Sequence, residues 1–267
     1  MAGCEIVRCA VVGHVEWVEF ARVPAFPAAG SIVHASETWS EPAGGGAVVA
    51  RQIALLAGRC ELFTALGDDD LGHESARRLA ALGIDVHARH GGQTRRAWTH
   101  VDGDGERTIT VLGDKLVPQG PLPLHGYDAV FFVSGDVEAL RSARSARLLA
   151  ATLREGPTLA AAHVQLDLLV GSLNDEGERL DDAVEAAVVV LTDGAAGGTV
   201  NGERFKAVAP PAAISDAYGA GDSFAAALLV GLARGDALPA ALDLAARAGA
   251  AVITGRGPYS AQLTSPA

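Results

Sequence analysis

The chain has 267 residues, a formal net charge of −11 and an apolar fraction of 49%. That length suffices for one large α/β domain with a small appendage, and the apolar residues can fill a large core. The charge argues against a nucleic-acid partner, because such a partner needs a basic face and no run of Lys or Arg supplies one. An acidic enzyme can still bind phosphate groups through backbone amides and local cations, so a nucleotide is not excluded.

The cysteines and the N-terminal segment bear on where the chain works. Cys4, Cys9 and Cys60 show neither metal-ligand spacing nor a disulfide framework, which favours a reducing cytoplasm. No charged N-terminal segment precedes a long apolar run, and no apolar run reaches the roughly 18 residues of a membrane span. We therefore expect a cytoplasmic protein without a signal peptide or membrane contact.

Strand and helix patterns alternate along most of the chain. Short apolar, β-branched runs predict strands, and helical apolar spacing that ends at Gly predicts helices. In chain order we expect strand 6–12, helix 46–57, strand 61–66, helix 72–82, strands 84–87 and 127–133, helix 138–154, strands 158–162, 168–170 and 187–191, and helices 223–233 and 240–254. This order is typical of a three-layer α/β/α fold with a doubly wound, mainly parallel sheet.

Two segments interrupt that rhythm. Residues 31–40 and 95–112 alternate apolar and polar side chains, and Asp102-Gly103-Asp104-Gly105 turns the second segment into a hairpin. An edge hairpin and a lid over the ligand-binding end of the sheet are both compatible with this pattern. We favour a lid because both segments lie near Gly-rich turns. The predicted division is a core of residues 1–30, 44–94 and 113–267 and a β-lid of residues 31–43 and 95–112.

The most informative stretch is residues 216–222, Asp-Ala-Tyr-Gly-Ala-Gly-Asp, which runs into an apolar helix. Free backbone N–H groups at a helix start, together with the positive end of the helix dipole, form a seat for an anion. Asp222 places a proton acceptor beside that seat. An anion hole next to a base suits phosphoryl transfer to a hydroxyl. The helix dipole should make this Asp a weaker base than a free one.

Two further Gly-rich turns are compatible with ligand binding. Residues 42–47 precede a helix and either cap it or bring the backbone close to a small polar ligand. Residues 192–198 follow a strand and form either a plain turn or a seat for nucleotide phosphates. The chain lacks both G-x-x-x-x-G-K-[ST] and G-x-G-x-x-G, which argues against a P-loop protein and against a Rossmann oxidoreductase.

Five motifs in this order resemble the ribokinase-like (pfkB) family of carbohydrate and nucleoside kinases over nearly the whole chain. They are Gly44-Gly45-Gly46, Leu66-Gly67-Asp68-Asp69-Asp70-Leu71-Gly72, Gly105-Glu106-Arg107-Thr108, Thr192–Gly198 and Asp216–Asp222. The resemblance implies that Asp222 is the catalytic base for a hydroxymethyl group. It also implies that Gly219, Ala220 and Gly221 form the anion hole for the γ-phosphate of ATP.

The resemblance implies cofactors and a partner as well. ATP would lie across Thr192, Gly194, Gly197 and a turn that includes Gly257, with Mg²⁺ bridging its phosphates. Asp216 and the carbonyl of Tyr218 match positions that hold a monovalent cation, such as K⁺, in some members. The β-lid forms the dimer contact in ribokinase-type members, so we expect a homodimer.

Three positions depart from the family pattern. Where members often carry Asn-x-x-Glu near Mg²⁺, this chain reads Ser172-Leu173-Asn174-Asp175, so Asp175 is the expected carboxylate. Val18 and Val48 replace an Asp and an Asn that often bind sugar hydroxyls. Ribose is therefore a doubtful substrate.

Other groups must then hold the acceptor. The candidates are His14, Glu16, Gly44, Gly45, Arg51 and a lid tryptophan, Trp39 or Trp98. Each also has an ordinary structural role open to it, such as a surface charge, a loop histidine or a salt bridge on a helix.

Our leading hypothesis is an ATP-dependent phosphotransferase that acts on a primary hydroxyl of a sugar, nucleoside or related small molecule. A non-catalytic nucleotide or metabolite sensor on the same fold is the alternative that the three departures favour. A sensor is disfavoured by the intact Asp222 and Gly219–Gly221, because a kinase homologue without catalytic activity has no chemical need for the base.

Overall fold

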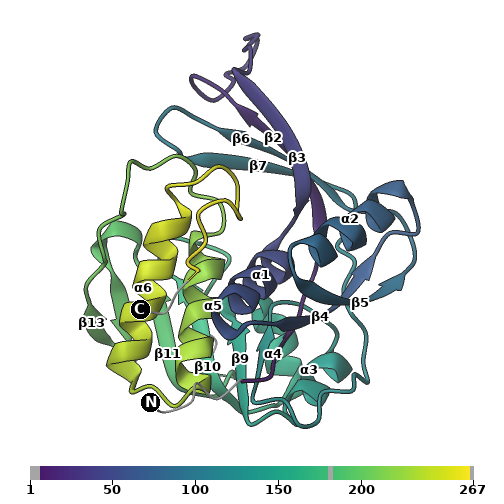
Figure 1. Cartoon of the computed structure of the whole chain (residues 1–267), viewed down its shortest axis with the longest axis vertical. Coiled ribbons are helices and arrows are strands. Elements are labelled where there is room, and N and C mark those ends of the chain that lie inside the picture. The colour runs from purple at the N-terminus through teal and green to yellow at the C-terminus, as the bar shows by residue number, and fades with distance from the viewer. Residues whose placement is uncertain (1–6, 180–182, 265–267) are drawn as a thin grey trace.

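The chain is described here by a computed structural model, which covers residues 7–179 and 183–264 (Figure 1). Cys4 and the first residue of the expected strand 6–12 lie outside the described residues. Two sheets organise the fold, a large one inside helical layers and a small one that covers an end of it.

The large sheet runs in the order β13-β12-β11-β10-β9-β8-β1-β4-β5 within the described residues. Its strands are β1 (Cys9–Val12), β4 (Cys60–Leu66), β5 (Ile84–His90), β8 (Ala129–Phe132), β9 (Leu148–Thr152), β10 (Leu166–Ser172), β11 (Ala186–Thr192), β12 (Gly198–Val200) and β13 (Glu203–Phe205). The strands from β5 to β11 in that order pair in parallel, and β12 and β13 add an antiparallel edge. The prediction of a doubly wound, mainly parallel sheet is confirmed.

Helices cover both faces of this sheet (Figure 1). On one face lie α1 (Gly45–Ala57), α2 (Asp70–Ala81), α5 (Ala220–Ala233) and α6 (Leu238–Val252), and on the other α3 (Val137–Ala143) and α4 (Gly156–Ala162). Strand β1 shows why both faces need a cover. Its Cys9 and Val11 join the first core cluster, whereas Ala10 and Val12 join the second. Such strands read as continuous apolar runs because neither face meets water.

The start of α1 lies unusually close to the end of β1, and glycine makes this possible. A Cβ atom on Gly46 would lie 2.6 Å from the backbone oxygen of His14, and one on Gly13 would lie 2.8 Å from the Cα atom of Gly46. Gly44 adopts φ 88°, a conformation that L residues with side chains rarely take. The Gly-rich turn therefore brings two backbone segments together at the carboxyl end of the sheet.

The small sheet contains β2 (Glu16–Arg22), β3 (Glu37–Ala43), β6 (Arg96–Val101) and β7 (Arg107–Leu112) in the order β3-β2-β6-β7. The expected hairpin is β6 and β7. Residues 16–22, predicted to belong to the core, instead form a central strand of this sheet. Val18 and Phe20 on its inner face are buried with Val48 and Tyr218, which explains the alternating pattern of the strand.

The prediction of one long helix over residues 138–154 is wrong. This stretch contains α3, then strand β9, then a short 3₁₀ turn at Leu153–Glu155. The expected strand 158–162 is instead part of α4. Leu149, Ala150 and Ala151 are fully buried between parallel neighbours, and this tertiary burial overrides the helix propensity of an Ala- and Leu-rich segment.

Candidate active site

A cavity of about 510 Å³ opens at the carboxyl ends of the parallel strands. Open α/β sheets bind their ligands at this edge. Its walls come from the loop after β1, the start of α1, the ends of β8 to β11, the tip of the β6–β7 hairpin and the start of α5. They include His14, Gly45, Arg107, Thr152, Arg154, Glu155, Asp175, Glu178, Thr192, Gly194, Gly219, Ala220, Gly221 and Asp222.

One wall is the N-terminus of α5. Gly219 precedes the helix at φ 83°, and a Cβ atom there would lie 3.0 Å from Cγ1 of Val48, so only glycine fits without strain. No side chain caps this helix start among the described residues. The first N–H groups of a helix have no intrahelical acceptor, so those at the start of α5 are available at the cavity. The structure thus groups Gly219, Ala220, Gly221 and Asp222 along one wall.

The environment of Asp222 makes it a stronger base than the sequence suggests. Burial raises the pKa of its carboxyl, and the positive charges of Arg107 and Arg154 lower it only in part. The prediction that the helix dipole leaves this Asp a weaker base is therefore wrong in direction. Loss of water around the carboxylate outweighs the favourable charges nearby.

Beside Asp222, the cavity is lined by His14 and by Gly45 of the Gly44–Gly45 turn. The His14 backbone N–H donates to Oγ of Ser134 at 2.9 Å, and the ring Nδ1 lies 3.0 Å from the same oxygen. Burial, with smaller contributions from Lys115 and Arg95, lowers the pKa of His14 to about 3, so the ring is neutral at neutral pH. A Cβ atom on Gly45 would lie 3.2 Å from Oδ1 of Asp222 and 3.8 Å from Cε1 of His14. The turn therefore lies between the histidine and the proposed base.

Glu16 lies next to this turn but does not reach the cavity. Its side chain is buried, its Oε2 is 3.4 Å from Nε of Arg95, and a Cβ atom on Gly44 would be 3.3 Å from its Cγ. Burial raises the pKa of Glu16, and Arg95 lowers it. Glu16 does not line the cavity in the described part of the chain, so any role toward a ligand runs through the Gly44 backbone or through Arg95.

The four residues expected to contact the nucleotide through turns divide into two pairs. Thr192 and Gly194 line the cavity, and the Thr192 hydroxyl donates to the carbonyl of Gly171 at 3.2 Å. Gly197 instead packs against the carbonyl of Phe205, where a Cβ atom would collide. The Gly257 N–H donates to Asp216 at 3.0 Å and does not face the cavity.

A wall of charged side chains faces α5 across the cavity. Arg154, which follows β9, pairs with Oδ2 of Asp175, and its Nε lies 3.5 Å from Oε1 of Glu178. Oε2 of Glu178 accepts the Ser172 N–H at 2.7 Å, and burial raises the pKa of this carboxyl. Asp175 was predicted from the sequence in this region, whereas Arg154 and Glu178 were not. An Asn174-x-x-x-Glu178 spacing, one residue longer than the family pattern, is the signal for the second carboxylate.

The loop before α5 is neutralised by protein groups. Asp216 is fully buried, and its two carboxylate oxygens accept the Tyr218 N–H at 2.9 Å and the Gly257 N–H at 3.0 Å. Arg22 donates to the carbonyl of Ser215 at 3.0 Å, and Arg107 donates to the carbonyl of Ala217 at 2.8 Å. These two guanidinium groups lie beside the residues expected to hold a monovalent cation. They bring positive charge close to Asp216, although Arg22 also pairs with Glu37 at 3.6 Å.

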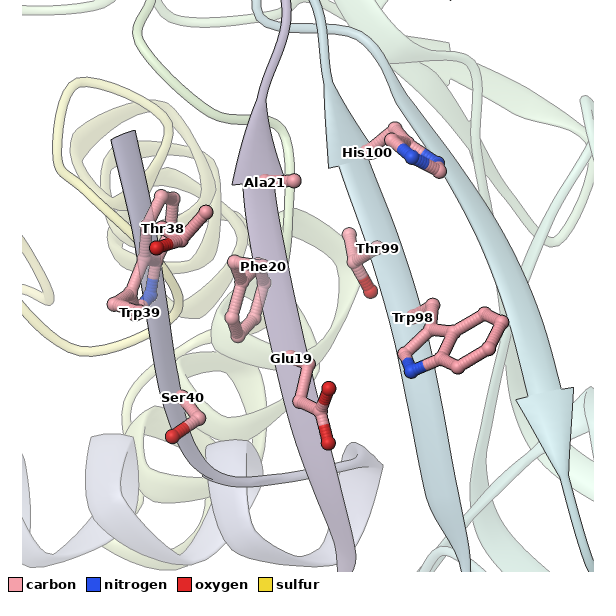
Figure 2. Close-up of a pocket in the computed structure, with 9 residues that line it drawn as sticks. All are labelled: Glu19, Phe20, Ala21, Thr38, Trp39, Ser40, Trp98, Thr99 and His100. Carbon is pink, nitrogen blue, oxygen red and sulfur yellow. The ribbon is translucent and has the colours of Figure 1, made fainter. Parts of the chain in front are cut away.

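Two expected substrate contacts lie away from the cavity. Arg51 donates to the carbonyl of Leu82 at the end of α2. Trp98 is 46% exposed on the outer face of the small sheet, where Glu19, Ser40 and His100 line a shallow groove with it (Figure 2). Trp39 stacks on Phe20 at the inner face instead. Within one chain, therefore, neither Arg51 nor Trp98 can contact an acceptor beside Asp222.

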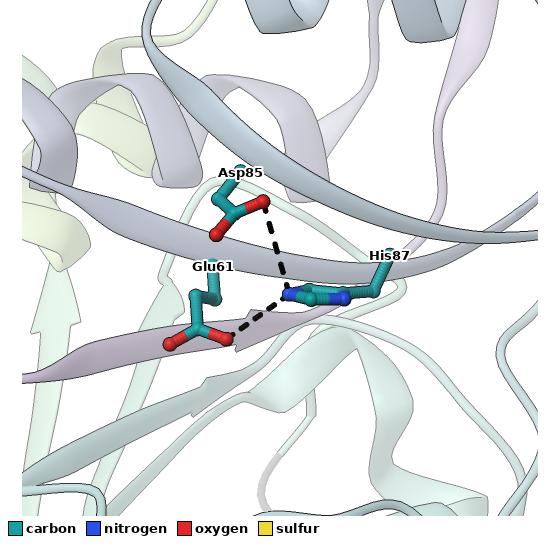
Figure 3. Close-up of side chains that lie close together, drawn as sticks. All are labelled: Glu61, Asp85 and His87. Carbon is teal, nitrogen blue, oxygen red and sulfur yellow. Dashed lines mark hydrogen bonds and ion pairs between the residues drawn. The ribbon is translucent and has the colours of Figure 1, made fainter.

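A second group of titratable side chains lies near the amino ends of β4 and β5, at the other edge of the sheet (Figure 3). His87 contacts Glu61 at 3.0 Å, and Arg8 contacts the same carboxylate at 3.1 Å. Asp85 lies 4.0 Å from both His87 and Arg59. Because two arginines already balance the acids, this cluster is an ion-pair network remote from the cavity.

Comparison with known proteins identifies the family of the chain and agrees with its fold. The family model described as "pfkB family carbohydrate kinase" matches residues 7–164 and 134–265, so the chain belongs to the pfkB family. An ATP-dependent ribose-1-phosphate kinase from Halopiger xanaduensis is 29% identical over 84% of each chain. The fructoselysine 6-kinase of Escherichia coli is 31% identical over 67% of this chain and 77% of its own. The ribokinase of Cryptococcus neoformans in complex with ADP superposes with a TM-score of 0.70, covering 96% of each chain at 20% identity.

Membership of this family defines the chain as a carbohydrate kinase. It uses ATP as the phosphate donor and acts on a small sugar-like or nucleoside-like molecule. In the part of the chain that the structure describes, no helix has the length and apolar character needed to cross a bilayer.

Proposed function

We propose that this kinase phosphorylates a primary hydroxyl of a sugar or a related small molecule, with Asp222 as the base and Gly219, Ala220 and Gly221 as the anion hole. The observation that carries the proposal is that all four residues line one cavity, with Gly45 and His14 facing Asp222. A nucleoside is the alternative acceptor class.

In this mechanism the acceptor hydroxyl donates a hydrogen bond to Asp222, which orients its oxygen toward the γ-phosphorus of ATP. A bond forms between that oxygen and phosphorus, the bond to the β,γ-bridging oxygen breaks, and Asp222 takes the proton. Backbone N–H groups at the start of α5 bind the oxygens of the transferring phosphoryl group. Because the transition state of such transfers is loose in most analyses, positioning and electrostatics contribute more than the strength of the base.

The carboxylates of Asp175 and Glu178 fit Mg²⁺, because hard oxygen ligands are what this ion prefers. We propose that they hold it, directly or through water, and that the ion neutralises phosphate charge when bound. The proposal includes no monovalent cation, because Arg22 and Arg107 already supply positive charge at the Ser215–Ala217 backbone.

The acceptor side of the cavity argues for a substituted sugar rather than free ribose. Val18 and Val48 are fully buried in the apolar cluster under the small sheet, so they offer no hydrogen bond to a hydroxyl. The polar groups near Gly44 and Gly45 include a neutral His14, the Glu16–Arg95 pair and the Tyr218 hydroxyl, which accepts the Gly44 N–H at 3.3 Å. The two relatives named above act on a sugar phosphate and on a sugar–lysine adduct, and both acceptors belong in a first panel.

The test is ATP consumption across sugars, sugar phosphates, sugar–amine adducts and nucleosides, with Asp222→Asn measured beside the parent chain. Turnover of at least one acceptor, lost in the variant, supports the proposal. Turnover that survives unchanged in Asp222→Asn rejects the assigned base. Calorimetric binding of ATP–Mg²⁺ without a phosphorylated product from any acceptor favours the sensor instead.

We also propose that two copies pair through the outer face of the small sheet, where Trp98 is exposed beside a groove of about 430 Å³. The check is light scattering at micromolar concentration for the parent chain, Trp98→Asp and the control Leu173→Asp, since Leu173 is 51% exposed in the loop after β10, outside the small sheet. A dimer that only Trp98→Asp dissociates supports this arrangement. A monomeric parent chain rejects it.

A further inference from the structure

The backbone of Arg154 is held by its neighbours, whereas its guanidinium group is half exposed. Arg154 lies in the 3₁₀ turn directly after β9, where it follows the buried Leu153, and its N–H is 3.4 Å from the Thr152 hydroxyl. Its side chain is 52% exposed and lines the cavity. The parallel sheet therefore fixes the Cα position at the cavity edge, while the guanidinium group is free to change partners.

The guanidinium group occupies the space between two carboxylates of one short loop. It pairs with Asp175 and lies 3.5 Å from Glu178, and a Cβ atom on Gly177 would be 2.7 Å from its Nη1. Asp175 also accepts the Gly177 N–H at 2.9 Å, so the loop holds its shape without the arginine. These are the carboxylates proposed above to hold Mg²⁺. A guanidinium group and a divalent cation cannot both occupy the space between them.

The strength of the pair allows exchange. The guanidinium group of Arg154 is half exposed, so water and salt screen its ion pairs and weaken them. A divalent ion with oxygen ligands competes well for two carboxylates on such terms. The charge of Arg154 also lowers the pKa of Asp222, which shows that its field reaches the opposite wall of the cavity.

We propose that Arg154 is an exchangeable counter-ion. It neutralises Asp175 and Glu178 while the cavity is empty, leaves them when a divalent cation binds there, and then faces the transferring phosphoryl group opposite Arg107. This inference rests on the proposed function and deepens it, because it assigns a further catalytic residue and a reason for the order of binding. An empty cavity keeps its acids paired, and a loaded one gains a second cation beside the phosphates.

The test measures divalent-cation binding without nucleotide or turnover. Mn²⁺ alone is titrated into the full chain, and free Mn²⁺ is read by electron paramagnetic resonance. We expect Arg154→Gln to bind Mn²⁺ about 2- to 5-fold more tightly than the parent chain, because the competing charge is gone. Arg154→Lys should stay near the parent value. The control Arg141→Gln, which breaks the exposed pair with Glu138 on α3, should change nothing. Asp175→Asn should weaken Mn²⁺ binding.

Unchanged or weaker Mn²⁺ binding in Arg154→Gln would overturn the exchange, since the arginine would then only stabilise the loop. In steady-state assays the same variant should lose turnover on the order of 10²-fold, the typical effect of removing one group that stabilises transition-state charge. Failure of the proposed function is a separate result. A parent chain that phosphorylates no acceptor can still show, or fail to show, the competition between Arg154 and Mn²⁺.

Discussion

The two walls of the cavity carry complementary charge on different kinds of group. The α5 wall offers backbone N–H groups at Gly219–Gly221, whose positions follow from the helix and from the contact of Gly219 with Val48. The facing wall offers long side chains, Arg154 from the turn after β9 and Glu178 from the loop after β10, and the guanidinium group of Arg154 is half exposed. Backbone donors cannot change partners and lose no side-chain entropy on binding. Under the proposed function, the first wall fixes where a phosphoryl group lies, and the side chains of the second rearrange when a divalent cation binds.

The largest expected effect comes from replacing Asp222, the one titratable group among the residues of the α5 wall. Asp222→Asn should lower kcat on the order of 10²–10⁴-fold, because the amide cannot take the proton of the acceptor. ATP binding should remain, since the N–H groups of α5 are untouched. The measurement is steady-state kinetics together with calorimetric titration of ATP. Asp243→Asn, on the exposed side of α6, is the control and should match the parent chain.

A crowding substitution tests whether the fixed wall tolerates displacement. Gly45→Ala would place a Cβ atom 2.8 Å from Cγ1 of Val133 and 3.2 Å from Oδ1 of Asp222. We expect kcat/KM for the acceptor to fall about 10²-fold, because displacements of about an ångström at a reacting group cost that much. Gly91→Ala is the matched control, since nothing lies within 4 Å of its Cβ position. Equal kinetics for the two variants would show that Gly45 does not adjoin the reacting groups.

The two walls also differ in how far the sequence predicts them. The α5 wall is one continuous stretch, residues 216–222, in which turn, helix start and carboxylate follow each other. The facing wall combines residues 152–155 with residues 172–178, which only the pairing of β9 with β10 brings together. Because β9 is rich in Ala and Leu, its pattern predicted a helix. Arg154 fell within that predicted helix and was therefore not recognised as a candidate site residue. Buried strands between parallel neighbours carry no alternation that would distinguish them from a buried helix.

The small sheet, too, could be predicted only in part, because spacing along the chain does not give the register of its strands. Its hairpin was predictable from alternation and from the Asp-Gly turn, but the membership of β2 was not, because Glu16–Arg22 directly follows the first core strand. The side to which each residue points depends on register. Trp98 pairs with Glu19, on the outer face, whereas Phe20 pairs with Trp39 on the inner face. Spacing along the chain does not report that register, so the acceptor role assigned to Trp98 could not be tested before the structure.

A smaller effect concerns the electrostatic field that Arg107 exerts on Asp222. Burial raises the pKa of this carboxyl, and Arg107 is the charge that lowers it most. A base must be deprotonated, so activity rises with pH through this pKa. Arg107→Gln removes a favourable positive charge, which raises the pKa further and moves the acid limb of the kcat/KM profile to higher pH.

This shift of the acid limb is tested by measuring pH–rate profiles for the parent chain, Arg107→Gln and the control Arg96→Gln. Arg96 pairs with Glu19 on the outer face of the same small sheet, so its loss should leave the acid limb in place. An acid limb that does not move in Arg107→Gln would mean either that this arginine lies too far from the base or that the limb belongs to another group. The same profile of Asp222→Asn separates those readings, because the limb must then disappear if it belongs to Asp222.

The smallest expected effect is an absence of change. At constant ionic strength and constant magnesium chloride, turnover should be the same in potassium chloride and in tetramethylammonium chloride. The Arg22 and Arg107 guanidinium groups already donate to the carbonyls of Ser215 and Ala217, and both carboxylate oxygens of Asp216 accept backbone N–H groups. Activation of the parent chain by potassium would show that these contacts leave a cation site open.

The double variant Arg22→Gln, Arg107→Gln sharpens this last comparison, because it removes both positive charges while the carbonyls and Asp216 stay. Burial already raises the pKa of Asp216, and the two arginines are charges that lower it. Without them the loop before α5 holds a buried acid with no nearby counter-charge, so a monovalent cation gains a reason to bind. Potassium should then restore part of the turnover that the double variant loses, whereas tetramethylammonium, which is too large and cannot be coordinated closely, should not. Such a gain would show that side chains of the small sheet, rather than a bound ion, stabilise the loop that leads into the anion hole.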